Sequence, residues 1–399
     1  MKSLTLFEIK KLFNIPFLKL FFVLLVAVNA FNIYSNYDTM LTPEKAIIGS
    51  VECEPDAIRY KMDNDFQGKI TAESVKSAKD HFQNCKSIAD GNTQIKEKLY
   101  YPLAYTDMVQ SKEIIEEMER LYKYNSDVIS PLLKNNEKLK GEARLKKDNY
   151  AIKTAELIDE TYSARDLENY YRVNEYEPLL SYKLSSLCIL LLSCFAGAYM
   201  FSGEKEKAMN SMIRCTKNGK RKIYFSKLAA LFIFCALCAA IFFYLDFLIF
   251  YLCRRPSGIF EPIYALKDYT YSPLNISVLG FYLLVSALKL FGIFAVSLFA
   301  FFFSSVFKRS YVSLLCAVFS LFLFMYSGLY TDGIFSALRY FNPLSLVTVT
   351  NLFKTLMLKN VFGVPVFSTY LHIVGVLLVG VTVVVATYSL SIRRSPNNA

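Results

Sequence analysis

Six long runs of apolar residues, nearly free of Asp, Glu, Lys and Arg, dominate the pattern of this chain. Each run can cross a bilayer as a helix, because ~30 Å of hydrocarbon at a rise of ~1.5 Å per residue requires ~20 residues. None shows the strict alternation of apolar and polar positions that a transmembrane strand would have. The runs are Pro16–Tyr34, Leu184–Ser202, Leu228–Leu252, Phe281–Phe307, Tyr311–Tyr330 and Tyr370–Ile392. The pattern therefore predicts an all-α polytopic membrane protein with six transmembrane helices.

A long polar segment, residues 37–180, separates the first run from the second. Apolar side chains recur at helical spacing across residues 108–122, and residues 69–90 and 142–172 have the pattern of polar helices. Five tyrosines lie between Tyr162 and Tyr182, just before the second run, which favours a helical stalk with tyrosines at the membrane interface. We therefore expect a separate, mainly helical domain here.

The remaining segments complete a four-part division of the chain. Residues 1–15 are basic and apolar and predict a helix at the membrane interface, residues 16–36 the first transmembrane helix, and residues 181–399 a region of five more. Residues 331–369 interrupt apolar clusters with Asn-Pro and Gly-Val-Pro, as expected of helices that enter the outer leaflet without crossing it. An alternative for the first run is a cleaved signal peptide, which would leave the other five spans oriented as before.

The distribution of charge predicts how the chain sits in the membrane. The net charge is +11, but residues 37–180 hold 21 Lys and Arg against 27 Asp and Glu, so the basic excess belongs to the apolar part. With both termini in the cytoplasm, the inner segments carry 16 basic residues and the short outer loops carry 6. This bias is typical of cytoplasmic termini in the cell membrane and of contact with anionic lipid, and it does not suggest nucleic acid. Residues 37–180 would then be an extracytoplasmic domain.

Few side chains suggest chemistry. The chain has 2 His, without a metal-ligand partner at helical spacing, and no nucleotide-binding P-loop, so we expect no catalytic residues, no metal and no cofactor bound by this chain. Cys53 and Cys85 are the cysteines of the polar domain, and a disulfide between them is compatible with an extracytoplasmic location. Whether they are bonded stays open.

Two charged residues, Asp246 and Lys289, lie inside apolar runs. A charge in lipid is costly unless it is paired, and both residues lie at a similar depth, so we expect them to pair with one another. They could form part of a translocation path. Alternatively, they could be a structural clamp, or Lys289 could extend its ammonium towards the interface.

The segment after the second run, residues 203–227, carries the most specific signal. From the end of the second run the chain reads Phe201-Ser-Gly-Glu204-Lys-Glu206-Lys-Ala208 and continues through Arg214 and Gly219-Lys-Arg221-Lys-Ile223 to Lys227. This order resembles the ABC-2-type exporter permeases, whose corresponding loop has Ser-Gly-Glu-x-Glu, then Arg, an aliphatic residue and Lys at the start of the third span. Here Ala208-Met209 replaces the Gly-Thr of the family. The start Phe7-Glu8-Ile9-Lys10-Lys11-Leu12 resembles the interfacial elbow helix of these proteins.

The resemblance implies a transmembrane subunit that carries no nucleotide itself. ATP and Mg would be bound by a cytoplasmic ABC ATPase subunit, and a second permease subunit, identical or different, would complete the complex. The cytoplasmic coupling loop 203–227 would contact the ATPase through Glu204, Glu206, Arg214 and Arg221. The site of Glu204 and Glu206 is expected to be solvated. Without the resemblance, the loop would suggest only the basic character usual for a cytoplasmic segment.

The function expected from this resemblance is ATP-driven export of a peptide, lipid-like or antimicrobial cargo by alternating access. A rival of another class is a membrane sensor or resistance module whose outer domain binds a ligand and relays a signal. A membrane enzyme is disfavoured, because no paired carboxylates and no Ser/His set occur near a membrane face.

Overall fold

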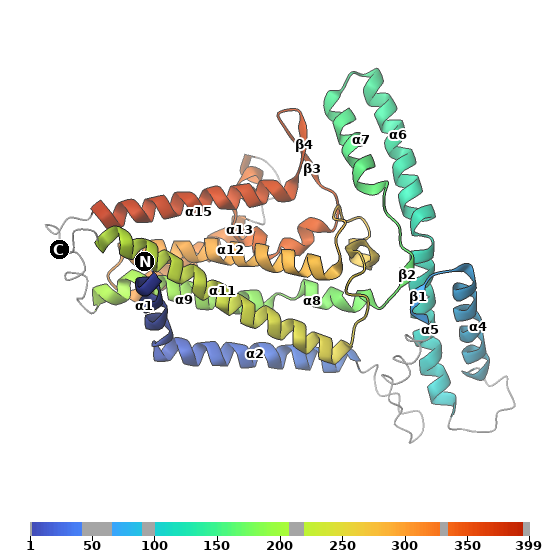
Figure 1. The fold of residues 1–399 in the computed structure, drawn as a ribbon, viewed down its shortest axis with the longest axis horizontal. Helices are drawn as coiled ribbons and strands as arrows, with labels where there is room; N and C mark the ends of the chain where they lie inside the picture. The colour runs from blue at the N-terminus through green and yellow to red at the C-terminus, as the bar shows by residue number, and fades with distance from the viewer. Residues whose placement is uncertain (1, 42–65, 90–99, 207–218, 328–333, 394–399) are drawn as a thin grey trace.

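In the computed structural model, the apolar runs form a bundle with a separate helical domain at one end (Figure 1). The structure describes residues 2–41, 66–89, 100–206, 219–327 and 334–393. Helix α1 begins and helix α15 ends at the same end of the bundle, which we call the basic end. The opposite end, which carries the polar helices, is called the domain end. The long helices of the bundle are α2 (Pro16–Leu41), α9 (Leu184–Glu206), α11 (Gly219–Arg254), α12 (Val278–Val306), α13 (Ser310–Ser327) and α15 (Ser368–Arg393).

The helical arrangement confirms the predicted all-α polytopic membrane fold. Five helices are long and apolar enough to span a bilayer, within Pro16–Asn36, Val173–Glu206, Arg221–Arg254, Val278–Val306 and Ser368–Ser391. The fifth predicted run corresponds to α13, whose apolar part, Ser310–Tyr326, is shorter. The last residues of that run, 328–330, lie outside the described residues.

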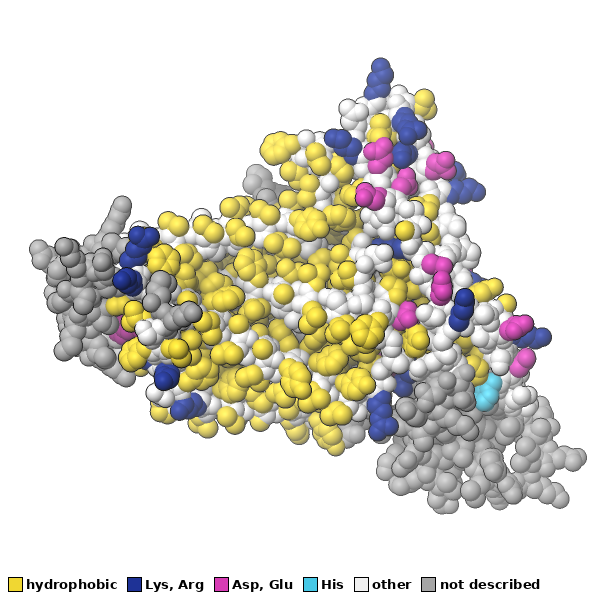
Figure 2. Space-filling model, viewed as in Figure 1, with side chains coloured by type: hydrophobic (Ala, Val, Ile, Leu, Met, Phe, Trp, Pro, Cys, Tyr) yellow, Lys and Arg dark blue, Asp and Glu magenta, His cyan; other side chains and the backbone are white. Residues whose placement is uncertain are grey.

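Helix α9 is the central element of the bundle, packing against α2, α11, α12 and α13. In its most apolar window 67% of the residues are buried, against 17% for α15, so α15 lies at the periphery. Figure 2 shows a broad apolar surface over the bundle, with Lys and Arg near its ends and most of the visible acidic side chains on the polar domain. Apolar side chains facing outwards along whole helices are expected where lipid is the surrounding solvent.

The short helix α1 (Lys2–Phe13) precedes α2 and runs across the direction of the bundle (Figure 1). Proline at position 16 is the first residue of α2, where its missing N–H and fixed φ are tolerated. The same proline prevents α1 and α2 from forming one continuous helix, because its ring is incompatible with a helix interior. The chain therefore turns at residues 14–15.

The polar domain consists of helical hairpins, with α4 (Ala72–Ala89) against α5 (Tyr100–Tyr122) and α6 (Ser130–Leu145) against α7 (Asn149–Tyr162). A π-helical turn, η1 (Tyr124–Ile129), connects α5 to α6. Ile114, Met118 and Leu121 of the predicted apolar face are buried, whereas Tyr122 is exposed. At the turn between α6 and α7, the Asp148 carboxylate caps α7 by accepting hydrogen bonds from two backbone N–H groups.

The helical stalk expected between Tyr162 and Tyr182 is wrong. The chain leaves α7 and pairs as strand β2 (Asn169–Tyr170) with β1 (Gly68–Lys69) in an antiparallel ribbon. It then forms two short helices, η2 (Val173–Tyr176) and α8 (Glu177–Ser181), before α9 begins. Tyr162, Arg165 and Tyr182 of this segment contact the bundle and the segment between α11 and α12, as described below. We infer that these contacts outweigh the weak preference of the segment for a helix.

Residues 334–367 differ in part from the helices that the sequence suggests. The short helices η5 (Ile334–Phe341), α14 (Leu344–Val347) and η6 (Val349–Phe353) are present. They are followed by an antiparallel hairpin of β3 (Leu358–Val361) and β4 (Val364–Phe367), which the sequence analysis did not predict. Its two-residue turn, Phe362-Gly363, has positive φ at both positions, as a type I′ turn requires.

Candidate functional site

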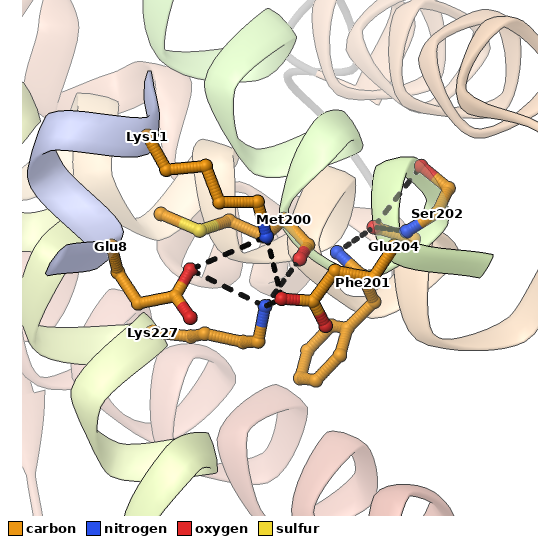
Figure 3. A network of polar contacts seen from close by, with 8 residues as sticks. Glu8, Lys11, Met200, Phe201, Ser202, Glu204 and Lys227 are labelled. Carbon is orange, nitrogen blue, oxygen red and sulfur yellow. Dashed lines mark hydrogen bonds and ion pairs between the residues drawn. The ribbon is translucent and has the colours of Figure 1, made fainter. Parts of the chain in front are cut away.

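Four charged side chains from three helices meet at the basic end of the bundle (Figure 3). We call Glu8, Lys11, Glu204 and Lys227 the four-charge cluster. Glu8 and Lys11 lie one turn apart on α1, Glu204 lies in the last turn of α9, and Lys227 lies near the start of α11. The cluster therefore joins the N-terminal helix to the two helices that flank the predicted coupling loop.

The contacts within the cluster are close. The Lys227 ammonium lies 2.6 Å from Oε1 of Glu204 and 3.4 Å from Oε2 of Glu8, and it donates to the Met200 carbonyl at 2.7 Å. The Lys11 ammonium lies 2.5 Å from the same oxygen of Glu204 and 3.7 Å from Glu8. The two carboxylates balance the two ammonium groups, which is the condition under which buried charges are tolerated.

Burial makes this cluster a structural element and not a solvated patch. Lys227 is 0% exposed, and Glu204 and Glu8 are each 5% exposed. The expectation that Glu204 is solvated is therefore wrong. Glu204 is buried because α1 lies across the ends of α9 and α11 and removes the carboxylate from water. The local sequence around Glu204 does not reveal this arrangement.

The residues next to Glu204 fasten α9 to further helices. The hydroxyl of Ser304 on α12 accepts hydrogen bonds from the backbone N–H groups of Phe201 and Ser202. The Lys205 ammonium donates to the carbonyls of Ser304, Ser305 and Phe307 at 2.7–3.0 Å, satisfying acceptors at the C-terminal end of α12. The Glu206 carboxylate accepts from the Ser310 N–H at 2.6 Å, at the N-terminus of α13. The segment thus positions the ends of α12 and α13 as well.

Gly203 in this segment lies under an aromatic ring. A Cβ at this position would come within 2.6–2.8 Å of ring atoms of Tyr199, one helical turn earlier. Any side chain at residue 203 would displace that ring. The glycine therefore allows Tyr199 to pack flat against the helix beside α1.

The other predicted coupling residues are placed differently. Glu206 and Arg221 are exposed at the basic end, where another protein could contact them. Arg214 lies outside the described residues, as do Cys53 and the side chain of Cys85, so the structure does not test the disulfide. Among the described residues, Glu206 and Arg221 are the exposed members of the predicted set.

Asp246 and Lys289 belong to one polar network inside the bundle but do not form the expected ion pair. The Asp246 carboxylate accepts from Asn29 of α2 at 2.7 Å and from the Ser185 hydroxyl of α9. The Lys289 ammonium donates to the Tyr182 carbonyl at 3.4 Å. The Tyr182 hydroxyl donates to Asn29 and Asn32, which links the two halves. Polar groups that the sequence analysis overlooked therefore satisfy each charge separately, although Asn29 interrupts an apolar run and was a visible signal.

This network predicts a particular pattern of energetic coupling. We expect Asn29→Ala and Asp246→Ala to destabilise the protein non-additively, with a coupling free energy of about 0.5–3 kcal/mol, because the two side chains share a buried hydrogen bond. The coupling between Asp246→Ala and Lys289→Met should be smaller. Double-mutant cycles on the unfolding free energy in bicelles measure both values. A larger coupling for Asp246 with Lys289 would indicate the direct pair after all.

The polar domain is held to the bundle by aromatic and cationic contacts. The guanidinium of Arg165 lies 4.3 Å from the ring centroid of Tyr162 and 4.7 Å from that of Tyr264, in the segment between α11 and α12. Tyr124 stacks on Tyr264 at 5.6 Å. Burial raises the pKa of Tyr162 to about 12, so its hydroxyl stays protonated and donates to the Tyr271 carbonyl at 2.8 Å. These contacts therefore attach the polar domain to the segment between α11 and α12.

Comparison with known protein families decides the class of this chain. The model of the ABC-2 family transporter proteins matches residues 15–388, which is nearly the whole chain. The chain belongs to this family. This ABC-2 family member is thus the transmembrane component of an ABC transporter, a multi-pass membrane protein whose family implies an ABC ATPase partner. Neither the curated proteins nor the solved structures contain a match.

Membership of the family relates the four-charge cluster to a partner ATPase. The family implies an ABC ATPase partner, so contacts that join several helices at one end of the bundle are of interest. In this ABC-2 family member the cluster connects α1, α9 and α11, while Lys205 and Glu206 extend the connection to α12 and α13. The sequence analysis identified Glu204 but assigned no role to Glu8 or Lys227. Glu8 was recognisable as an acidic residue in an otherwise basic N-terminal segment.

Proposed function

We propose that this protein is the membrane subunit of an ATP-driven exporter and that ATPase-driven motion enters at the basic end, which faces the cytoplasm. The observation that carries the proposal is the four-charge cluster. It fastens α1 to the ends of both helices that flank the coupling loop. Displacement of this loop by a docked ATPase would therefore move α1, α9 and α11 together. A loop without such connections would absorb the displacement.

The exposed residues Glu206 and Arg221 are the proposed contacts with the ATPase, and Glu204 acts behind them by holding the helices in register. A second permease subunit, identical or different, would pair with this one so that cargo leaves along their interface. Peptides, lipid-like compounds and antimicrobial agents are the proposed cargo classes. The polar domain, tied to the segment between α11 and α12, would then lie on the side of cargo release.

Isolation of the tagged full-length chain from its native membrane tests this proposal against the sensor alternative. We expect an ABC ATPase to be recovered with the chain and to be lost when Arg221 is changed to Glu. Lys308→Glu is the matched control, because Lys308 is also exposed at the basic end but lies outside the coupling loop. Recovery of a histidine kinase without any ATPase would favour the sensor and overturn the exporter.

A further inference from the structure

A groove of about 400 Å³ lies at the basic end, between α1 and α9, separate from the buried centre of the four-charge cluster. One part of its wall is cationic and polar and the rest is apolar or aromatic. The residues that define it are Phe7, Lys10, Lys11, Asn14, Ile15 and Tyr199. The ring of Tyr199 is the one that packs over Gly203, so the shape of the groove depends on that glycine.

The two lysines of the groove differ in their surroundings. Lys11 is held by Glu204 and Glu8, whose carboxylates are buried. Lys10 is exposed and forms no ion pair with any residue that the structure describes. Among the residues that the structure describes, no carboxylate lines the groove. Its electrostatic character is therefore positive, and Lys10 supplies an ammonium that an anion can reach.

The groove opens beside the surface of the protein that contacts lipid. Helix α1 lies across the bundle, and α2 runs along the bundle from beside α1 (Figure 1), beginning at Pro16, which lines the groove. Among the exposed side chains at the start of α2, Phe17 and Leu20 are 56% and 71% exposed, with the exposed Lys19 between them in sequence, and Phe7 on the groove wall is 60% exposed. Exposed lysines next to exposed apolar side chains have the composition of a headgroup site beside an acyl-chain site.

We propose that this groove binds the headgroup of an anionic phospholipid, with its phosphate at Lys10 and an acyl chain along Phe17 and Leu20 of α2. The lipid phosphate is favoured over a free phosphate because Pro16, which lines the groove, begins the helix that exposes Phe17 and Leu20, and a soluble anion gains nothing from those apolar side chains. The proposal concerns lipid recognition and does not depend on the direction of transport or on the cargo. It would place an anionic lipid next to Lys11, which belongs to the four-charge cluster.

A single introduced tryptophan provides a specific probe, because the chain contains no Trp. The Phe7→Trp variant, reconstituted at full length in phosphatidylcholine vesicles, places the reporter in the groove wall. Brominated phosphatidylglycerol should quench this reporter with an apparent affinity about fivefold above that of brominated phosphatidylcholine, the preference expected for one lysine near the headgroup. Adding Lys10→Gln should remove that preference, whereas adding Lys308→Gln should keep it. A second reporter, Leu378→Trp on the outward face of α15, should show no preference.

Equal quenching of the groove reporter by both lipids, or a preference that survives Lys10→Gln, would overturn the proposal. Native mass spectrometry of the chain with its own Phe7 provides an independent measurement. After exposure to equal amounts of the two lipids, the chain should retain phosphatidylglycerol in excess, and Lys10→Gln should lose the excess. Inorganic phosphate added at the concentration of the lipid should not displace it, and displacement would assign the groove to soluble anions instead.

Discussion

Changing Glu204 to Gln is expected to destabilise the protein by about 3–5 kcal/mol, the cost typical of removing one partner from a buried ion pair. The substitution keeps the shape of the side chain but removes the charge that both Lys11 and Lys227 contact. Glu8 would remain as the one carboxylate beside two ammonium groups, and Lys227 is fully buried. The unfolding free energy in bicelles, measured by SDS titration, gives this value directly.

Glu206→Gln is the matched control for this experiment. Glu206 lies two residues further along the same helix and is exposed. It accepts one hydrogen bond at the start of α13. We expect a loss of about 1 kcal/mol or less, because exposed charge contacts at helix ends contribute little. Equal losses for the two substitutions would contradict the structural role assigned to the four-charge cluster.

Changing Gly258 to Ala is expected to loosen the attachment of the polar domain. Gly258 has φ +74°, a conformation that costs an L-residue about 1–2 kcal/mol. Its new Cβ would lie 2.4 Å from the Cβ of Tyr171, so the two backbones must also separate. Overpacking of this kind costs about 1–3 kcal/mol more. Faster cleavage by trypsin within residues 130–172 of the folded protein would report the loosening.

Gly363→Ala separates the conformational cost of positive φ from the cost of overpacking against Tyr171. Gly363 has φ +80° in the hairpin turn, and a Cβ there meets nothing within 4 Å. Only the conformational cost applies, so this variant should be less destabilised than Gly258→Ala and should leave cleavage of the polar domain unchanged. If both variants behave alike, the contact between Gly258 and Tyr171 does not hold the domain.

The helices could be predicted from the sequence because each depends on a long local pattern. Apolar runs of about 20 residues have few alternatives in lipid, so α2, α9, α11, α12 and α15 followed from length and composition. The hairpin of β3 and β4 could not be predicted in the same way. Its four-residue strands carry too little periodicity, and its turn has a phenylalanine at one of the two positions of positive φ.

The candidate site was predictable in its position but not in its physical state. The order Ser202-Gly203-Glu204 directed attention to the correct turn of α9. The burial of Glu204 depends on Glu8, Lys11 and Lys227, which lie 196, 193 and 23 residues away in sequence, and local pattern contains no information about such distant partners. Asp246 and Lys289 illustrate the same limit, because similar depth suggested a pair while Asn29, Ser185 and Tyr182 provide the contacts.

The most direct test of the central claim is ATP hydrolysis by the co-isolated ATPase, measured in vesicles with and without this chain. If motion enters through the coupling loop, vesicles that contain the chain should hydrolyse ATP at a different rate from the ATPase alone. Arg221→Glu should abolish that difference, and Lys308→Glu should preserve it. The same rate with and without the chain, at matched amounts of ATPase, would contradict the account.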